Sequence, residues 1–323
     1  IITVRPLFFD EFACKASACN NTCCQKWEID IDDDTKALYE ALPGELGDKV
    51  RRSIVTSSDG STCFSLNEKG YCHLLTEEGL CSLVLAKGDG YLCQICRDHP
   101  RFYKTLYDDL DIAGTGLACE RTVEQLMEAG ELLLTDGEEA FTLGDFLSDL
   151  GYEKLLPSFQ LELPTFEAFT DMIQRLTLVE AIDDEWTQRI AYWQSHLEEG
   201  YDYFKEQLPI PSSLVVSLFE YIAFRYLDLL EDYSWNALVR FFNESVWYIL
   251  LEIYATSVII PSICRWSEEI EYSTESIDIL LQDIEKEYAT VKAQKDFLLD
   301  SLQCENVENV NILLTKQQKE ENE

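Results

Sequence analysis

The stretch Cys14-Lys15-Ala16-Ser17-Ala18-Cys19-Asn20-Asn21-Thr22-Cys23-Cys24 opens a region that is far richer in cysteine than the rest of the chain. Ten of the twelve cysteines lie between Cys14 and Cys119. The same region is rich in Asp, Glu, Gly and Lys, so it offers little apolar material for an ordinary core. We therefore expect its thiols to organise the N-terminal third by holding an iron–sulfur cluster or zinc, or by pairing as disulfides.

Composition narrows the compartment and the partners. The chain has 323 residues, 46% of them apolar, and carries a net charge of -36 from 61 acidic and 25 basic residues. This excess of acid argues against a nucleic-acid partner, because phosphate binding relies on clustered Lys and Arg. The most apolar segment, Asn243 to Ile263, is interrupted by Glu244 and Glu252, so no membrane partner is expected. No secretion signal is recognisable, and we expect a cytoplasmic protein, in which metal or catalytic use of cysteine is favoured over disulfides.

The N-terminal part is expected to be loop-rich. Residues 1–135 are broken by Gly, Asp, Asn and Ser and predict a cysteine-rich domain with short elements. The alternation from Trp27 to Asp32 is typical of a short strand. Thr122 followed by Gln125 three residues later resembles a capping box, which predicts a helix from about Val123 to Leu134.

The remainder of the chain is expected to be helical. Residues 136–164, which contain Pro157 and Pro164, are interpreted as a linker, and residues 165–315 as an all-α domain. Apolar stripes at helical spacing are formed by Phe166, Phe169, Ile173, Leu176 and Leu178, by Trp186, Ile190 and Trp193, and by Val215, Leu218, Phe219, Ile222, Tyr226, Leu229 and Leu230. The third stripe is expected to start at Pro211, further helices over Asn236–Val258 and Ser276–Leu302, and a charged tail over 316–323. The predicted fold is mainly α, with a loop-rich metal-cluster domain that carries short strands, followed by the helical domain.

The cysteine spacing favours a cluster over a simple zinc knuckle. Adjacent Cys23 and Cys24 do not match two separated CxxC pairs, and the sequence has one true CxxC, Cys93 to Cys96. Cluster irons accept thiolates at irregular spacing, and the thiols exceed the four that one cluster needs. Some are therefore structural, or there is a second metal. The radical-type pattern CxxxCxxC is absent, because Lys26 stands where its third cysteine would be.

Several of these runs resemble the bacterial flagellin lysine-N-methylase family. The resemblance covers most of the chain to about Tyr288 and is carried by Phe12-Ala13-Cys14, Cys19, Thr22-Cys23-Cys24-Gln25-Lys26-Trp27-Glu28-Ile29, Cys72, Glu78-Gly79-Leu80-Cys81, Leu92-Cys93, Cys96, Pro100-Arg101, Cys119-Glu120, Phe219-Glu220-Tyr221, Phe224-Arg225-Tyr226 and Ser267-Glu268-Glu269-Ile270-Glu271. The front half is also similar to small zinc- or iron-chelating domains. This sequence departs from the family pattern at His99, where tyrosine is usual, at Glu120, where proline is usual, and at Cys63, which is an addition.

The resemblance implies an enzyme that transfers a methyl group from S-adenosyl-L-methionine to lysine ε-amines of flagellin and contains a four-iron, four-sulfur cluster. Its implied metal ligands are Cys14, Cys19, Cys23, Cys24, Cys72, Cys81, Cys93, Cys96 and Cys119. Cys63 is a weaker candidate, while Cys264 and Cys304 fall in helical patterns and are expected to be core thiols. The alternative is a non-enzymatic iron- or zinc-chelating protein whose helical part binds a partner.

Candidate cofactor-binding residues are Trp27, Arg97 and Arg101. An aromatic face attracts sulfonium and ammonium groups, although Trp27 can equally just cover the cluster. The arginines flank the CxxC and suit cluster charge or the donor carboxylate, and ordinary salt bridges explain them as well. His73, His99 and His196 are expected to make ordinary hydrogen bonds more often than metal contacts. The run Asp111 to Gly116 mimics a Rossmann glycine loop, but we expect a turn there, because helix follows helix after Pro164.

Overall fold

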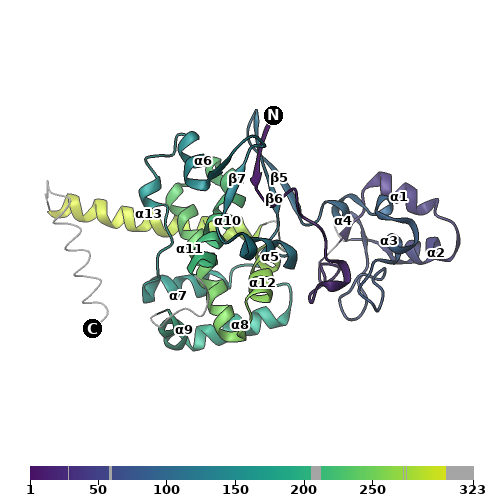
Figure 1. The fold of residues 1–323 in the computed structure, drawn as a ribbon. Helices are drawn as coiled ribbons and strands as arrows, with labels where there is room; N and C mark the ends of the chain where they lie inside the picture. Colours follow the sequence, from purple (N-terminus) through teal and green to yellow (C-terminus); the bar gives the residue numbers. More distant parts are fainter. Residues whose placement is uncertain (28, 58–59, 205–211, 272, 274, 303–323) are drawn as a thin grey trace.

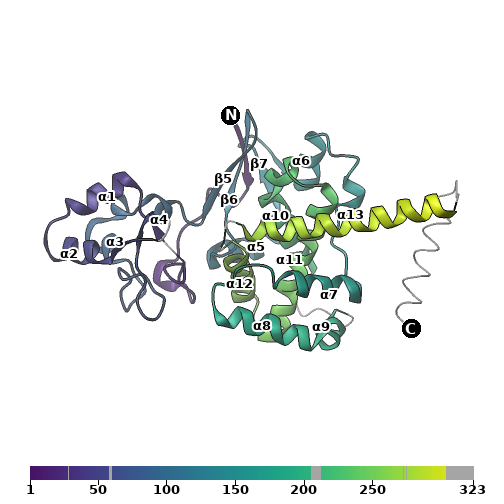
Figure 2. The ribbon, with the colours of Figure 1, turned by 180° about the vertical axis from the view of Figure 1, so that it is seen from behind.

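The computed structural model describes residues 1–27, 29–57, 60–204, 212–271, 273 and 275–302. A smaller part that carries α1 to α4, here called the cysteine lobe, lies beside one end of a larger part, the body (Figure 1). The body holds a mixed sheet and α5 to α13, and the view from behind shows the same division (Figure 2). The described residues from 165 onward contain only helices, which confirms the helical C-terminal region.

The cysteine lobe is built from short elements, as expected. Its helices are α1 (Asp33–Glu40), α2 (Gly44–Ser53), α3 (Ser82–Lys87) and α4 (Gln94–Asp98), with 3-10 turns η1 (Ala16–Ala18) and η2 (Asp89–Tyr91). Its strands β2 (Ile29–Asp30), β3 (Ile54–Thr56) and β4 (Thr62–Phe64) form an antiparallel sheet in the order β2-β4-β3. The strand predicted from Trp27 to Asp32 is thus only two residues long, and Glu28 lies outside the described residues.

The body sheet has the strand order β5-β6-β1-β7-β8. Its strands are β1 (Ile2–Pro6), β5 (Arg101–Tyr107), β6 (Leu110–Thr115), β7 (Leu133–Thr135) and β8 (Ala140–Thr142). β1 runs parallel to β6, and the other neighbours pair antiparallel. β1, β5 and β6 share one hydrophobic core with the C-terminal helices, whereas the lobe has a core of its own, so the body core draws on residues from both sides of position 135.

Two further expectations between residues 119 and 164 are corrected. The helix expected over 123–134 is α5 (Glu120–Ala129), which begins after Cys119 and ends before Gly130, a residue with φ +72°. Thr122 lies inside α5 and makes no capping box. The segment 136–164, expected as a linker, holds β8, helix α6 (Leu143–Asp149) and the 3-10 turn η3 (Leu156–Ser158).

The helical part of the body agrees closely with the sequence pattern. Its elements are α7 (Phe166–Arg175), α8 (Asp184–Ser195), α9 (Leu197–Tyr203), α10 (Ser212–Arg225), η4 (Leu227–Glu231), α11 (Trp235–Thr256), α12 (Ile260–Ile270) and α13 (Ser276–Leu302). The stripe on α8 and the α10 stripe from Val215 to Tyr226 are buried. In the first stripe, Phe166 and Leu178 are exposed instead. Pro211 and the tail 316–323 lie outside the described residues.

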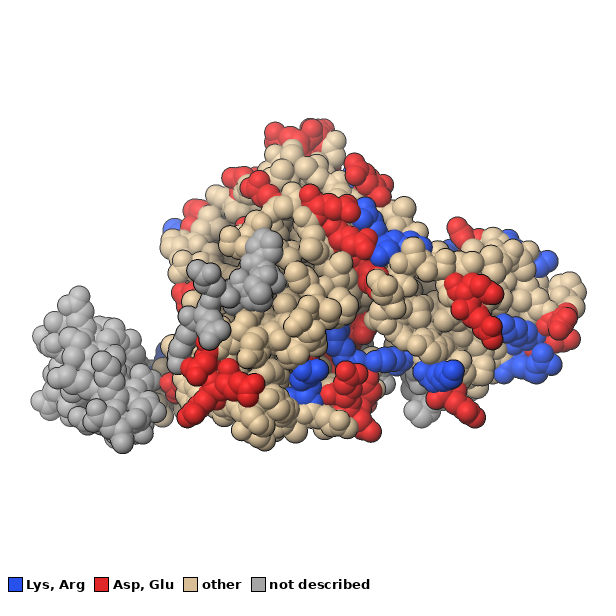
Figure 3. Space-filling view, turned by 60° about the horizontal axis from the view of Figure 1, so that its bottom comes forward, with Lys and Arg blue, Asp and Glu red and all other residues tan. Residues whose placement is uncertain are grey.

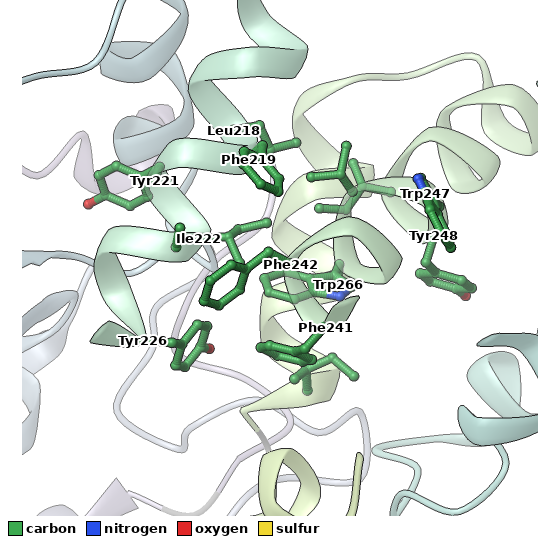
Figure 4. Close-up of a cluster of buried hydrophobic side chains, with 14 of the residues drawn as sticks. Leu218, Phe219, Tyr221, Ile222, Tyr226, Phe241, Phe242, Trp247, Tyr248 and Trp266 are labelled. Atoms are coloured by element: carbon green, nitrogen blue, oxygen red, sulfur yellow. The ribbon is translucent and has the colours of Figure 1, made fainter. Parts of the chain in front are cut away.

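The core of the body is aromatic and dense. Figure 4 shows Phe241 and Phe242 of α11 packed between α10 side chains and Trp266 of α12. Arg175 on α7 is 3% exposed and pairs with Glu244 of α11 at 2.6 Å and with Glu287 of α13 at 2.6 Å, so one buried cation ties three helices together. Among the described residues, no helix has the length and apolar content that a membrane crossing requires.

Candidate metal centre and adjoining pocket

Five thiols lie together in the core of the cysteine lobe, and we call them the five-thiol group: Cys24, Cys72, Cys81, Cys93 and Cys96. The amide of Cys72 donates to the carbonyl of Cys24 at 2.9 Å, and Leu75 bridges to Cys81, so short backbone pairings fold these segments onto one another. Asp32 accepts from the Gln94 amide at 2.8 Å and thereby fixes the start of α4, which carries the CxxC.

The thiols of this group affect one another. A hydrogen bond from the Cys96 thiol lowers the pKa of Cys93, and the same contact raises the pKa of Cys96. Burial raises the pKa of Cys72 to about 11, with Cys24, Cys81 and Cys93 adding to the effect. The five side chains are therefore close neighbours in an apolar setting.

Four other thiols lie where the lobe meets the body, and we call them the four-thiol group: Cys14, Cys19, Cys23 and Cys119. Burial, the Glu120 carboxylate, Cys119 and Cys14 together raise the pKa of Cys19 to about 11. The Cys23 thiol donates a hydrogen bond to Cys24 that raises its own pKa, and Cys119 and Cys14 raise it further. The adjacent residues Cys23 and Cys24 thus touch each other but have different further neighbours.

Glu120 holds the four-thiol group together, and sequence reasoning missed this role. Its side chain, 3% exposed, accepts from the amides of Asn20 at 3.0 Å and Asn21 at 2.5 Å. Lys15 pairs with it at 3.1 Å and with Glu124 at 2.5 Å. The loop from Lys15 to Asn21 is therefore fastened to the first turn of α5, next to Cys119. The one available signal was the departure from the family pattern at this position.

The chemistry of the thiols fits a soft metal. Among the described residues, no three His, Cys, Asp or Glu side chains already stand in the arrangement of a metal-ion site. The donors that gather are nevertheless all sulfur, which is the ligand that iron–sulfur clusters and structural zinc prefer. Such ligands close on the metal as it binds, because binding and folding are coupled. Neither group includes His73, which is exposed.

A pocket of about 180 Å³ opens beside Cys23, between the lobe and the body. Its lining comes from the segment that begins at Cys23, from single residues before Pro100, Cys119 and α8, and from α12 and its C-terminal cap: Cys23, Gln25, Lys26, Trp27, His99, Ala118, Ile182, Ser267, Glu268 and Glu271. Lys26 has φ +67°, an uncommon conformation outside glycine, and its Nζ pairs with Asp183 at 2.9 Å. Backbone strain of this kind is found disproportionately at functional sites.

Trp27 and His99 form the aromatic wall of the pocket. The Trp27 indole N–H donates to the Cys23 carbonyl at 2.6 Å, and its ring centroid lies 5.8 Å from that of His99. Burial lowers the pKa of His99 to about 4, so the imidazole is neutral at pH 7. Its Nε2 is buried without a hydrogen-bond partner among the described residues. Such an atom is costly unless a ligand group completes it.

The two carboxylates of the pocket differ in their partners. Glu271 is neutralised by Arg225 at 2.5 Å and accepts from Tyr226 and Ser267; although burial raises its pKa, these contacts outweigh it and lower the pKa. Glu268 accepts one hydrogen bond, from the side-chain amide of Asn21 at 3.0 Å, and burial raises the pKa of Glu268. Within the described part of the chain, Glu268 is therefore the pocket carboxylate that lacks an ion pair.

The remaining candidates lie elsewhere. Arg97 is exposed and donates to Gln94, while the guanidinium of Arg101 stacks on Phe12 at 5.0 Å, so neither lines the pocket. His196 is exposed and stacks on Tyr192. Cys264 is fully buried in the body core, as expected, and Cys304 lies outside the described residues. Cys63 is buried in β4.

The Rossmann-like run forms a strand where a turn was expected. Residues 110–115 are β6, and Gly114 stands opposite Phe102 on β5, with Gly116 just beyond the strand. Neither glycine has a positive φ. The sheet that contains β6 lacks the succession of parallel strands of a dinucleotide-binding fold.

No protein-family model, curated protein or solved structure gives a significant match to this chain.

Proposed function

We propose that this chain is an S-adenosyl-L-methionine-dependent protein-lysine N-methyltransferase that acts on flagellin and requires an iron–sulfur cluster. The observation that carries the proposal is the pocket beside Cys23, which combines an aromatic wall, an unpaired carboxylate and a neutral, unpartnered imidazole. These are the groups that methyl transfer between a sulfonium and an amine needs. The resemblance of the cysteine runs to flagellin lysine-N-methylases supplies the substrate and the donor.

The pocket suits a sulfonium donor and a lysine side chain that arrives as an ammonium and reacts after it loses a proton. The face of Trp27 attracts a sulfonium or an ammonium group, and Glu268 supplies the opposite charge. Its volume is below that of pockets that enclose a whole drug-sized ligand, so it is expected to hold the reacting ends only. The cluster, when bound by the thiols, would anchor the loop that carries Cys23 and Trp27.

Lysine must lose a proton before its nitrogen attacks. We assign that proton to the Glu268 carboxylate, whose pKa is raised by burial, and we assign the alignment of the lysine nitrogen to Nε2 of His99, which is neutral and has no partner among the described residues. S-adenosyl-L-methionine, when bound in the pocket, would supply the methyl group that the deprotonated lysine nitrogen takes up, with a neutral thioether as the leaving group. The residues of the pocket thus bind, align and deprotonate, which is most of what this transfer requires.

Transfer to flagellin tests the proposal. Iron-replete protein is incubated with flagellin and labelled methyl donor, and the label is located by mass spectrometry. We expect label on lysine ε-nitrogens. His99→Gln should lower kcat by about 10²-fold, since it keeps a polar side chain but displaces the nitrogen that aligns the lysine amine. Glu268→Gln should lower kcat by about 10²-fold because it removes the proton acceptor, and should raise the flagellin KM about tenfold because it removes the opposite charge.

His196→Gln is the matched control, because His196 is exposed and lies outside the pocket. Equal rates for His99→Gln and His196→Gln would remove His99 from the mechanism. No transfer by iron-replete wild-type protein would reject the enzyme and favour the chelating alternative, in which the helical body binds a partner.

A further inference from the structure

We propose that this chain holds two separate metal centres and that the adjacent residues Cys23 and Cys24 deliver one thiolate to each. The four-thiol group forms the first centre and the five-thiol group forms the second. Both sets consist of sulfur donors, so each would take a thiophilic metal, as an iron–sulfur cluster or as a zinc ion. This inference concerns metal binding alone and does not depend on methyl transfer.

The chain brings together more thiols than one metal centre uses. A four-iron cluster and a structural zinc ion each take four thiolates, and nine thiols gather at the lobe and its junction with the body. One centre would leave five thiols unused in an acidic protein. Two centres use eight, and the ninth belongs to the five-thiol group.

The two groups of thiols are built by different parts of the fold. The five-thiol group belongs to the lobe core, where its members pack with Ile29, Tyr39 and Leu74. None of the four-thiol group belongs to that core. Cys119 directly precedes α5 of the body, and Glu120 fastens the loop of Cys19 to that helix.

The adjacent residues Cys23 and Cys24 belong to different groups. Cys24 is tied into the lobe by the hydrogen bond from the Cys72 amide to its carbonyl. Cys23 faces the pocket and lies near Cys14 and Cys119. The Cys23 and Cys24 thiols touch each other, but Cys24 packs against the lobe core and Cys23 does not, so the pair lies between the two groups and can give one thiolate to each.

The two centres would have different consequences. The lobe core is small, and domains of this size often need a metal to fold, so the second centre would stabilise the lobe. The first centre would border the pocket through Cys23, and its Cys14 and Cys23 are exposed. Damage to the first centre should therefore leave the lobe folded.

Cobalt titration counts the centres. Reduced, metal-free full-length protein is titrated with Co2+ alone under anaerobic conditions, and the thiolate-to-cobalt absorption is followed. We expect two equivalents for the wild type. Cys14→Ser should reduce the count to one, and Cys14 is exposed, so its replacement does not open a core. Cys93→Ser alone leaves four thiols in the five-thiol group, so the double variant Cys93→Ser/Cys96→Ser, which leaves three, should remove the other equivalent. Cys63→Ser, outside both groups, should remove none.

The titration has outcomes that overturn the proposal. A wild-type count of one equivalent contradicts two centres. A count of zero for Cys14→Ser means that one shared site uses both groups, and a count of two means that the four-thiol group is not a site. Iron, zinc and sulfide analysis of anaerobically purified wild type and Cys14→Ser then tells whether a cluster or zinc occupies each centre.

Discussion

Glu120 shows what a single residue contributes that pattern reading does not detect. Its partners are two backbone amides and a lysine about a hundred residues earlier in the chain, and none of them can be recognised from sequence spacing. His99 is similar, because its burial and its unpartnered Nε2 depend on the contact between lobe and body. The concentration of cysteines in the N-terminal third could be recognised from sequence, but their division into two groups could not.

Asp183 is the residue through which the pocket segment is fixed to the body. It pairs with Lys26 at 2.9 Å and with Arg265 at 2.7 Å, and it caps α8. Burial raises its pKa, but the hydrogen bonds from Lys26 and Arg265 outweigh this and lower the pKa to about 2. The stabilisation is therefore complete above about pH 4, the unfolded-state value, and is lost as pH falls toward 2.

Asp183→Asn should lower the free energy of unfolding by about 2 kcal/mol at pH 7, because it removes the charge but keeps an oxygen for the cap. The difference from wild type should shrink between pH 4 and pH 2. Urea unfolding at several pH values measures it, with Asp184→Asn, an exposed neighbour, as the control. A difference that is the same at pH 7 and pH 3 would refute the assignment.

At the scale of elements, success followed periodicity. α11 was predicted within two residues at each end, and α13 begins at the predicted residue Ser276, because long apolar stripes at helical spacing predict a helix clearly. α5 was misplaced because Leu132 and Leu134 are as apolar as a helix face requires, yet both are buried outside the helix, Leu134 in β7 beside β1 and Leu132 just before that strand. Short apolar runs leave helix and strand undecided until pairing partners are known.

Alanine substitutions at Gly114 and Gly116 test whether these glycines are needed for packing or for cofactor binding. A Cβ on Gly114 would lie 2.5 Å from the Phe102 ring and 3.2 Å from the Tyr221 hydroxyl, which donates to the Thr115 carbonyl at 2.6 Å. Gly114→Ala should therefore cost about 1–3 kcal/mol in unfolding free energy. At Gly116 the nearest atom is 3.5 Å away, so Gly116→Ala should be nearly neutral.

Thermal unfolding and donor calorimetry on both variants check this expectation. If Gly116→Ala abolished donor binding while stability and iron content stayed normal, the glycine run would have to be reconsidered as a donor loop. Equal stability of the two alanine variants would show that Phe102 and Tyr221 move aside at little cost.

The molecule as a whole consists of the cysteine lobe and the helical body, with the pocket at their junction. Its net charge of -36 favours cationic partners. On the face shown in Figure 3, acidic side chains form several groups separated by neutral surface, and basic side chains lie near the junction and on the lobe. Charge on this face is thus distributed over many elements, so we place substrate recognition at the pocket and not on one broad patch.

Photochemical cross-linking of labelled S-adenosyl-L-methionine tests the location of the site most directly. Metal-replete protein is irradiated with the labelled donor, digested, and the labelled peptides are sequenced. If the donor binds in the pocket, we expect label on the peptide that contains Trp27 or on the peptide that contains residues 267–271, and unlabelled donor should reduce this labelling. Label confined to residues 111–116, or to peptides that do not line the pocket, would contradict it.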